Sequence, residues 1–174
     1  ATNTYNGVTT VDGGTLRVTG SVSSSNEVHV GAGGTFEAAS NQVVPYLTVA
    51  DGGRVVVSAG VLQLGSTGAK VPMSLGGVLD VTTRGVIVAA SPNVTPSALH
   101  EVGLYVLTGT ITSSSAAADP TRKAVAYALA GDVLGPSGGT FFGVPVNGSA
   151  VLVRYTLFGD ATLDGGVDFN DLVR

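Results

Sequence analysis

Short runs of alternating apolar and polar residues, each following a pair of glycines, recur along the first half of the chain. The four copies read Val-Asp-Gly-Gly-Thr-Leu-Arg-Val (11–18), Val-Gly-Ala-Gly-Gly-Thr-Phe-Glu-Ala (30–38), Val-Ala-Asp-Gly-Gly-Arg-Val-Val-Val (49–57) and Leu-Gly-Gly-Val-Leu-Asp-Val (75–81). Their second glycines stand at positions 14, 34, 53 and 77, so the repeat is 19 to 24 residues long. A regular repeat of this length indicates a stack of similar structural units.

The residues that follow each glycine pair keep one register. Side chains alternate between the two faces of a strand, so the second and fourth residues past the pair share a face. These eight positions are all apolar: Leu16, Val18, Phe36, Ala38, Val55, Val57, Leu79 and Val81. The residues between them are predicted to face solvent. They are Arg17, Glu37, Val56 and Asp80, and all except Val56 are charged. We also expect Arg17 and Glu37 to form an opposite-charge pair on adjacent units.

One such unit is too small to bury its apolar face, whereas stacked copies cover one another. A repeat of roughly 20 residues fits one turn of a β-solenoid with two or three short strands. The expected fold class is therefore all-β, with a right-handed β-solenoid (β-helix) over residues 1–84. A β-sandwich of hairpins joined by Asp-Gly-Gly turns is the alternative, and the regular spacing and facing of the repeat favour the solenoid.

The first copy also carries a family resemblance. Residues 4–18, Thr-Tyr-Asn-Gly-Val-Thr-Thr-Val-Asp-Gly-Gly-Thr-Leu-Arg-Val, resemble the autotransporter-associated β-strand repeat. The later copies resemble it more loosely, and the resemblance extends over about residues 2–84. It implies a passive, elongated extracellular scaffold of the kind found in the β-helical stalks of large bacterial surface proteins.

From residue 85 the repeat is lost, and a β-rich C-terminal module is expected over residues 85–158. Strands are predicted within 86–90, 121–134 and 151–158, although the alanines of 121–134 leave a short helix possible there, and residues 113–120 are predicted to form a loop. An edge strand is expected at 141–146, because Pro145 has no N–H to donate to a sheet. Apolar residues also alternate within 100–110, as in a strand. Such a module would cover the last turn of the solenoid.

No comparable segment precedes the first repeat. A bare first turn exposes backbone donors and acceptors, which pair readily with another strand. We expect this edge to be covered by an upstream part of a longer protein or by a second copy of the chain, end to end, which gives a fibre. The chain starts at Ala1 and shows no signal peptide, so we interpret it as a processed product or a piece of a longer chain.

Composition narrows the classes of partner. Only 11% of the residues are charged, and 26 are glycine. The exposed surface is therefore expected to be Ser, Thr, Asn and Gly, which suits β-structure better than a helical bundle. No basic patch is present, so a nucleic-acid partner is not expected. No apolar run reaches the roughly 20 residues that a membrane helix needs.

The last segment, residues 159–174, carries the most specific motif. Gly-Asp-Ala-Thr-Leu-Asp-Gly-Gly-Val-Asp-Phe-Asn-Asp-Leu (159–172) places oxygen atoms at the spacing of an EF-hand calcium loop. The expected ligands are Asp160, Thr162, Asp164, the carbonyl of Gly166, Asp168 and Asp171. Gly165 is expected to make the sharp turn, and Val167 to be the apolar anchor of the loop. Calcium takes six to eight oxygen ligands and is the expected cofactor; an Asp-rich solvated turn is the alternative.

This tail has a family resemblance of its own. An Asp in place of Glu at the closing position, and a strand before the loop in place of a helix, resemble type I dockerin loops. Together with Val-Leu-Val-Arg-Tyr-Thr-Leu-Phe (151–158), the tail is similar to the dockerin-bearing tails of planctomycete surface proteins. The resemblance implies calcium binding and a cohesin-like partner. A dockerin carries two such loops, and this sequence contains one.

Two acceptor sequons, Asn93-Val-Thr and Asn147-Gly-Ser, mark Asn93 and Asn147 as candidate glycosylation sites. Catalytic residues are not expected. His29 and His100, the two histidines, have no matching Ser or Cys constellation. The carboxylates of the repeats are scattered, whereas glycoside hydrolysis needs a facing pair.

Together these features predict a secreted protein of a bacterial surface or extracellular matrix with a structural role. It would be a self-assembling fibre subunit, stabilised by calcium. The alternative is a cell-surface binding module that docks through its dockerin-like tail to a cohesin-like partner or to glycans.

Overall fold

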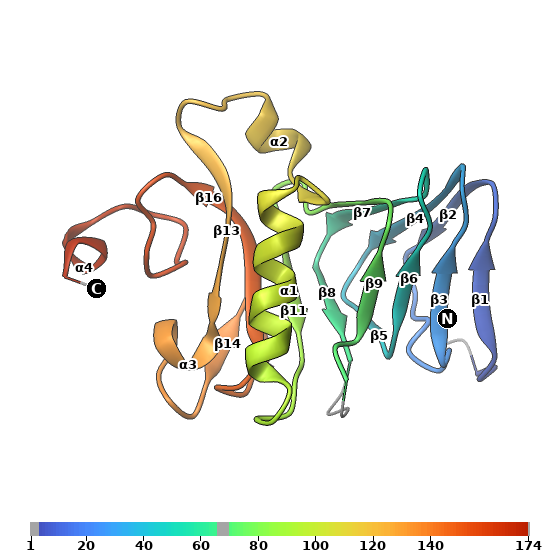
Figure 1. Ribbon diagram of the computed structural model, residues 1–174, viewed down its shortest axis with the longest axis horizontal. Coiled ribbons are helices and arrows are strands. Elements are labelled where there is room, and N and C mark those ends of the chain that lie inside the picture. The colour runs from blue at the N-terminus through green and yellow to red at the C-terminus, as the bar shows by residue number, and fades with distance from the viewer. Residues whose placement is uncertain (1–3, 66–69, 174) are drawn as a thin grey trace.

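The computed structural model describes residues 4–65 and 70–173, and the first half of the chain is a coil of short strands. Figure 1 shows the coil at the blue-to-green end of the chain, with the helices and remaining strands gathered at the other end. The coil makes about four turns, which place strands in three sheets around a common core. The predicted β-solenoid is therefore confirmed.

Each sheet stacks strands from successive turns. The first sheet contains β1 (Val8–Val11), β3 (Glu27–Val30), β6 (Leu47–Val49) and β9 (Met73–Leu75). The second contains β2 (Gly14–Val18), β4 (Gly34–Ala39), β7 (Arg54–Ala59), β10 (Val78–Asp80) and β12 (Ile111–Thr112). The third contains β5 (Gln42–Val44), β8 (Val61–Leu64), β11 (Gly85–Val88), β16 (Val151–Leu157) and β13 (Lys123–Leu129). Strands of successive turns pair in parallel, which excludes a sandwich of antiparallel hairpins.

The register of the second sheet follows the repeat in the sequence. Leu16 lies opposite Phe36, Phe36 opposite Val55, and Val55 opposite Leu79. Seven of the eight positions predicted to face inward are buried, and Leu16, in the first turn, is half-buried. The predicted pair on the outer face also forms, with Arg17 Nε 3.0 Å from Glu37 Oε1. The alternation in the sequence therefore identified the core of the solenoid correctly.

The repeated glycines are needed where the turns stack most closely. A Cβ on Gly34 would lie 1.9 Å from the carbonyl oxygen of Val11, and one on Gly77 would lie 2.3 Å from that of Gly53. Neither distance is physically possible, so only glycine fits at these two positions. The glycine pairs therefore mark, in the sequence, the positions where one turn stacks on the next.

Asp80 departs from the prediction that it faces solvent. Its side chain points outward from β10, but only 1% of the residue is exposed. It accepts hydrogen bonds from the backbone N–H groups of Thr82 and Ser114, both at 2.9 Å, and it pairs with Arg54. The cause is α2 (Ser114–Ala117), which folds back with β12 over the outer face of the fourth turn. That contact comes from residues more than 30 positions away, so the repeat does not reveal it.

The second half is less purely β than predicted. The strands expected within 86–90, 121–134 and 151–158 are present as β11, β13 and β16, and the region 141–146 forms a hairpin of β14 (Gly139–Phe141) and β15 (Val144–Val146). However, most of the segment 100–110, whose apolar residues alternate, is helical, because residues 95–107 form α1 (Thr95–Leu107). The predicted loop at 113–120 contains α2, and two more single-turn helices follow: α3 (Ala130–Val133) and α4 (Phe169–Leu172). In the described part of the chain, no helix has the length and hydrophobicity to cross a membrane.

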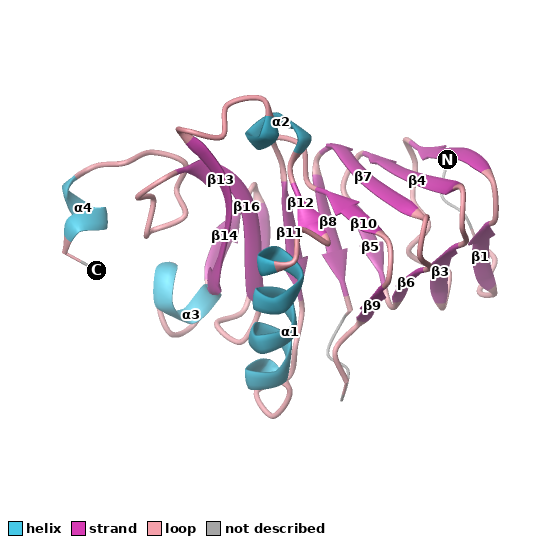
Figure 2. Ribbon diagram, turned by 45° about the horizontal axis from the view of Figure 1, so that its top comes forward, coloured by secondary structure: helices cyan, strands magenta, loops and turns pink. Residues whose placement is uncertain are grey.

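The last turn of the solenoid is closed. Figures 1 and 2 show α1 beside the C-terminal strand β13, at the end of the solenoid where β16 pairs with β11. Ala98 and Val102 of α1 are fully buried against the solenoid core, and the Tyr105 hydroxyl accepts a hydrogen bond from the backbone N–H of Leu75 in β9 at 3.3 Å. β12 extends the second sheet, and β16 pairs antiparallel to β11 in the third. β11 itself lies past the predicted boundary at residue 84, yet it continues the parallel stack on β8.

The first turn is open on two of its three sides. Within residues 4–65 and 70–173, β1 and β2 are the outermost strands of their sheets, and no strand pairs with their outer edges. The third side of this turn has no strand. There the side chain of Gln42 accepts a hydrogen bond from the N–H of Val22 at 3.2 Å and donates one to the carbonyl of Gly20 at 2.7 Å. The two ends of the solenoid therefore differ: one is covered by the module, and the other presents unpaired strand edges.

Candidate metal centre

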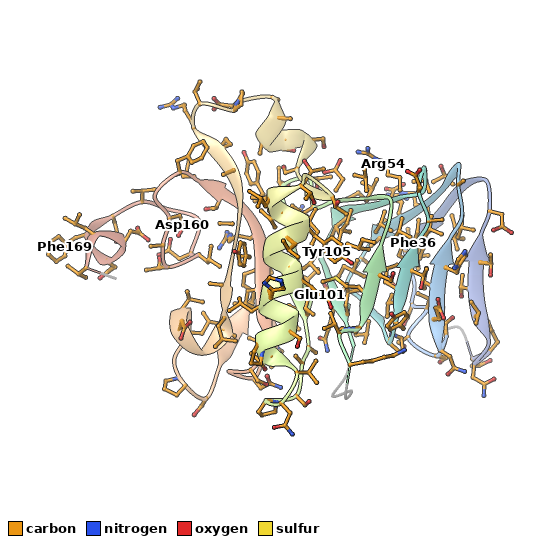
Figure 3. The ribbon with its side chains drawn as sticks, in the orientation of Figure 1. Phe36, Arg54, Glu101, Tyr105, Asp160 and Phe169 are labelled. Atoms are coloured by element: carbon orange, nitrogen blue, oxygen red, sulfur yellow. The ribbon has the colours of Figure 1, made fainter. Side chains whose placement is uncertain are left out.

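The segment predicted to bind calcium follows β16 and ends in α4. It projects from the C-terminal module on the side away from the solenoid (Figures 1 and 3), and Figure 3 shows Asp160 within the loop and Phe169 at its outer end. Three backbone positions with positive φ shape it: Gly159 at 94°, Leu163 at 55° and Gly165 at 98°. The turn expected at Gly165 is therefore confirmed.

Asp160 organises the start of the loop. The residue is only 5% exposed, and its carboxylate points into the loop. It accepts hydrogen bonds from the backbone N–H groups of Asp164, at 3.1 Å, and Gly165, at 2.9 Å, and from the hydroxyl of Thr156. A buried carboxylate needs such donors, because an isolated charge removed from water is costly. The first predicted ligand therefore holds the loop closed around itself.

Asp171 returns from α4 to the same place. Its Oδ1 accepts from the backbone N–H of Thr162 at 2.9 Å and from the Thr162 hydroxyl at 3.0 Å. The same hydroxyl lies 3.4 Å from Oδ1 of Asp160. The N–H groups of Asp168, first, and of Thr162 hold the pKa of the Asp171 carboxyl below its usual range, since they stabilise its charged form. The structure thus brings together three of the predicted ligands: Asp160, Thr162 and Asp171.

The other two predicted carboxylates bond elsewhere. Oδ1 of Asp164 accepts from the N–H of Gly166 at 2.8 Å, and Oδ1 of Asp168 caps α4 by accepting from the N–H of Asn170 at 2.7 Å. Asp168 and Asp171 form a reciprocal capping box at the start of this helix. Among the described residues, no three His, Cys, Asp or Glu side chains form a group suited to hold a metal ion. The full ligand set stays a prediction.

The donor chemistry nevertheless fits a hard cation. The predicted set consists only of oxygens: four carboxylates, one hydroxyl and the backbone carbonyl of Gly166. Calcium prefers such ligands, whereas zinc prefers nitrogen and sulfur. Asp160 and Asp171 already face one hydroxyl, so their charges are not dispersed over the surface. The residues present therefore fit calcium.

The apolar anchor of the loop is Leu163. The prediction that Val167 has this role is wrong, because that residue is 51% exposed. Leu163 is buried instead and packs with Phe141 and Leu152 of the C-terminal module. Its backbone has a positive φ of 55°. Ligand spacing alone does not reveal which apolar residue has a packing partner.

Arg154, on β16, is a residue of this region that the sequence did not single out. One of its N–H groups donates to the carbonyl of Leu163, and its guanidinium lies over the ring of Phe142, 4.7 Å from the centroid. Burial lowers its pKa, and the negative charges of Asp160 and Asp164 oppose that effect. Arg154 therefore ties the loop to the module and balances part of the acidic charge.

The two candidate glycosylation residues are accessible. Asn93 is exposed in the turn before α1, and Asn147 is exposed in the turn after β15. Oδ1 of Asn147 accepts from the N–H of Ser149 at 3.1 Å and from its hydroxyl at 2.7 Å. Glycosylation at both positions stays a prediction.

Calcium is expected to stabilise the fold measurably. A ligand that binds only the native state adds about 2.7 kcal/mol to the free energy of unfolding at a hundredfold excess over its dissociation constant. Thermal unfolding in excess calcium and in excess EDTA measures this difference. Asp160→Asn should abolish it, since the variant removes one charged ligand at nearly constant volume.

The matched control is Asp51→Asn, which removes a carboxylate from an exposed turn of the solenoid. This variant should retain the full calcium-dependent increase. Each comparison is made within one variant, so a change in intrinsic stability does not affect it. Equal melting temperatures for the wild-type chain in calcium and in EDTA would show that the loop does not bind the ion.

Comparison with protein-family models, with curated proteins and with solved structures finds no match for this chain.

Proposed function

We propose that this chain is an extracellular structural protein that associates with a second copy through the open end of its solenoid. Calcium fixes its C-terminal loop, and its role is to extend and connect rather than to catalyse. The observation that carries this proposal is the difference between the two ends: unpaired edges of β1 and β2 at one end, and a closing module at the other.

The backbone pattern shows which groups are available at the open end. The N–H of Gly31 donates to the carbonyl of Val11 at 2.9 Å, so Val11 faces the second turn. Backbone groups alternate in direction along a strand, so Thr10 directs its N–H and carbonyl away from β3. In the second sheet the N–H groups of Leu79 and Val81 face the following segment, which places those of Thr15 and Arg17 at the outer edge. Unpaired groups of this kind are a template for another strand.

We expect the second copy to be engaged through the same surface. At the other end of the solenoid, α1 covers β9, β16 occupies the edge of β11, and the outermost strand of the second sheet, β12, is only two residues long. The open end of one copy therefore meets the open end of another in a self-complementary, two-fold contact. A fibre requires a second contact for each subunit. The exposed apolar residues of the tail supply a surface for it: Val167, Phe169, Leu172 and Val173.

Thr10→Pro is expected to convert the associated form to a monomer. Proline removes the N–H that β1 presents at its outer edge, and edge strands tolerate proline on the side that faces away from their partner. Analytical ultracentrifugation of the wild-type chain and the variant gives the two masses.

Thr10→Ala is the matched control, since it shortens the same side chain but keeps the N–H. It should associate as the wild type does. Circular dichroism confirms that both variants remain folded. A wild-type chain that stays monomeric at every concentration would contradict the proposal, and so would a Thr10→Pro variant with unchanged mass.

The exposed apolar tail also favours a second candidate function, a docking module for a cohesin-like partner. Four apolar residues within seven positions, all more than half exposed, leave apolar surface in water that a partner would cover. Capture of the chain by an immobilised cohesin in calcium, lost for Phe169→Ala, is the expected result. Failure of the wild-type chain to bind would remove this candidate and leave the structural proposal intact.

A further inference from the structure

A cleft of about 650 Å³ lies between the C-terminal loop and the β14–β15 hairpin. Its lining comes from Arg154 of β16, from the loop and α4, and from α3 and the hairpin. The volume falls within the range of pockets that hold small ligands. The cleft lies away from the open end of the solenoid, and it shares Thr162 and Asp164 with the predicted calcium loop.

Polar side chains of several kinds line the cleft. They are Thr140, Arg154, Thr162, Asp164 and Asn170. Arg154 only donates hydrogen bonds, Asp164 only accepts them, and the amide and hydroxyls do both. The charged side chains in the lining are one Arg and one Asp, so the cleft carries no net charge. This array matches a neutral ligand with many hydroxyl groups better than a cation or an anion.

Phe142 adds an apolar surface to the same cleft. It is 36% exposed, and its φ of 49° lies in the left-handed region that bulky residues rarely adopt. Phe141 packs edge-on against it with ring centroids 4.9 Å apart, and the guanidinium of Arg154 lies over the ring. Phe142 and Gly143 both have positive φ because they form the two-residue turn of the β14–β15 hairpin, and this turn fixes the position of the ring. An exposed aromatic ring is therefore held in a costly conformation next to convergent polar groups.

We infer that this cleft binds a neutral saccharide. A pyranose presents hydroxyls around its rim and a face of C–H groups, and the cleft offers hydrogen-bonding side chains beside an aromatic ring. A peptide would instead be expected to pair with the backbone of a strand edge, whereas the polar groups of this cleft are side chains. Thr162 and Asp164 belong to the loop, so the saccharide contacts the calcium loop as well as the module.

The test is a titration of the full chain, in calcium, with neutral sugars: glucose, galactose, mannose and N-acetylglucosamine. Glucuronate and glucosamine serve as charged counterparts. Isotope-edited NMR reports which amides shift. At least one neutral sugar is expected to shift amides of the cleft, around residues 142, 154 and 164, and to bind at least about tenfold more tightly than the charged sugars.

Phe142→Gly is the informative variant, because glycine adopts the positive φ without strain while the ring is lost. It should stay folded and bind the preferred sugar at least about tenfold more weakly. Phe158→Ala, which removes an exposed phenylalanine outside the cleft, should bind within about twofold of the wild type.

Three results would overturn the inference: no shift with any neutral sugar, tighter binding of the charged sugars, or unchanged affinity in Phe142→Gly. A peptide library that shifts the same amides when the sugars do not would overturn it too. The mass measured by ultracentrifugation is a separate readout, so failure here does not decide whether the chain self-associates.

Discussion

Phe36→Ala is expected to lower the free energy of unfolding by about 3–5 kcal/mol, as truncation of a buried phenylalanine commonly does. Phe36 is completely buried, at 0% exposure, in the second turn of the solenoid (Figure 3). It lies in register between Leu16 of the first turn and Val55 of the third. Because the turns are held apart by backbone pairing, they collapse little into the cavity. Urea denaturation followed by circular dichroism measures the loss.

Val43→Ala is the control for this prediction. Val43 lies on β5 with its side chain outward and is 37% exposed, so the variant should change the free energy of unfolding by only about 0.5 kcal/mol or less. Equal losses for the two variants would contradict the assignment of inner and outer faces.

Asp80→Ala is expected to cost about 2–4 kcal/mol, a large loss for a residue on the outer face of its strand. The N–H groups of Thr82 and Ser114, which make part-buried hydrogen bonds to the buried Asp80, would lose their acceptor, and an unsatisfied group of this kind costs about 1–3 kcal/mol. The Arg54 side chain, which is 45% exposed, would return to water at little cost. The same urea titration measures the loss.

Glu37→Ala provides the comparison, because Glu37 occupies the equivalent position two turns earlier. Its carboxylate bonds to Arg17 and Ser58 at the surface, and the Ser58 hydroxyl, first, and Arg17 lower its pKa. Water replaces these partners when the side chain is removed, so the loss should be clearly smaller than for Asp80→Ala. A larger loss for Glu37→Ala would show that α2 does not shield Asp80.

The solenoid was predictable because the sequence pattern that specifies it is local and repeats from turn to turn. The register of Phe36, Val55 and Leu79 follows from alternation after each glycine pair, and the glycines themselves mark the close stacking of turns. The burial of Asp80 was not predictable in this way. It depends on α2, residues 114–117, which packs over Asp80, and no pattern near Asp80 in the sequence indicates that contact.

The helix α1 was missed because two periods overlap in it. Val102, Leu104 and Val106 alternate as in a strand, whereas Ala98, Val102 and Val106 recur every four residues as in a helix. The available signal was Pro96, which lies in the first turn of the helix, where proline is favoured. Tertiary packing of Ala98 and Val102 on the solenoid core decides the outcome.

In the predicted calcium loop, spacing identified the acidic residues but not their partners. Asp160 and Asp171 face the Thr162 hydroxyl as the pattern predicts, while Asp164 and Asp168 bond to nearby backbone N–H groups. Short acidic side chains commonly form such local bonds. The choice between Leu163 and Val167 as anchor depends on the surface of the module, which the motif does not contain.

Pairing at the open end of the solenoid is tested most directly by residue-resolved amide hydrogen exchange. NMR spectra of the full chain are recorded over a wide range of protein concentration, with exchange rates read for the outer-edge amides of Thr10 and Arg17. If two copies associate through the open end, these amides become protected from exchange as the protein concentration rises, since the second copy then accepts their hydrogen bonds. Exchange at the rate of free amides at every concentration would contradict this association.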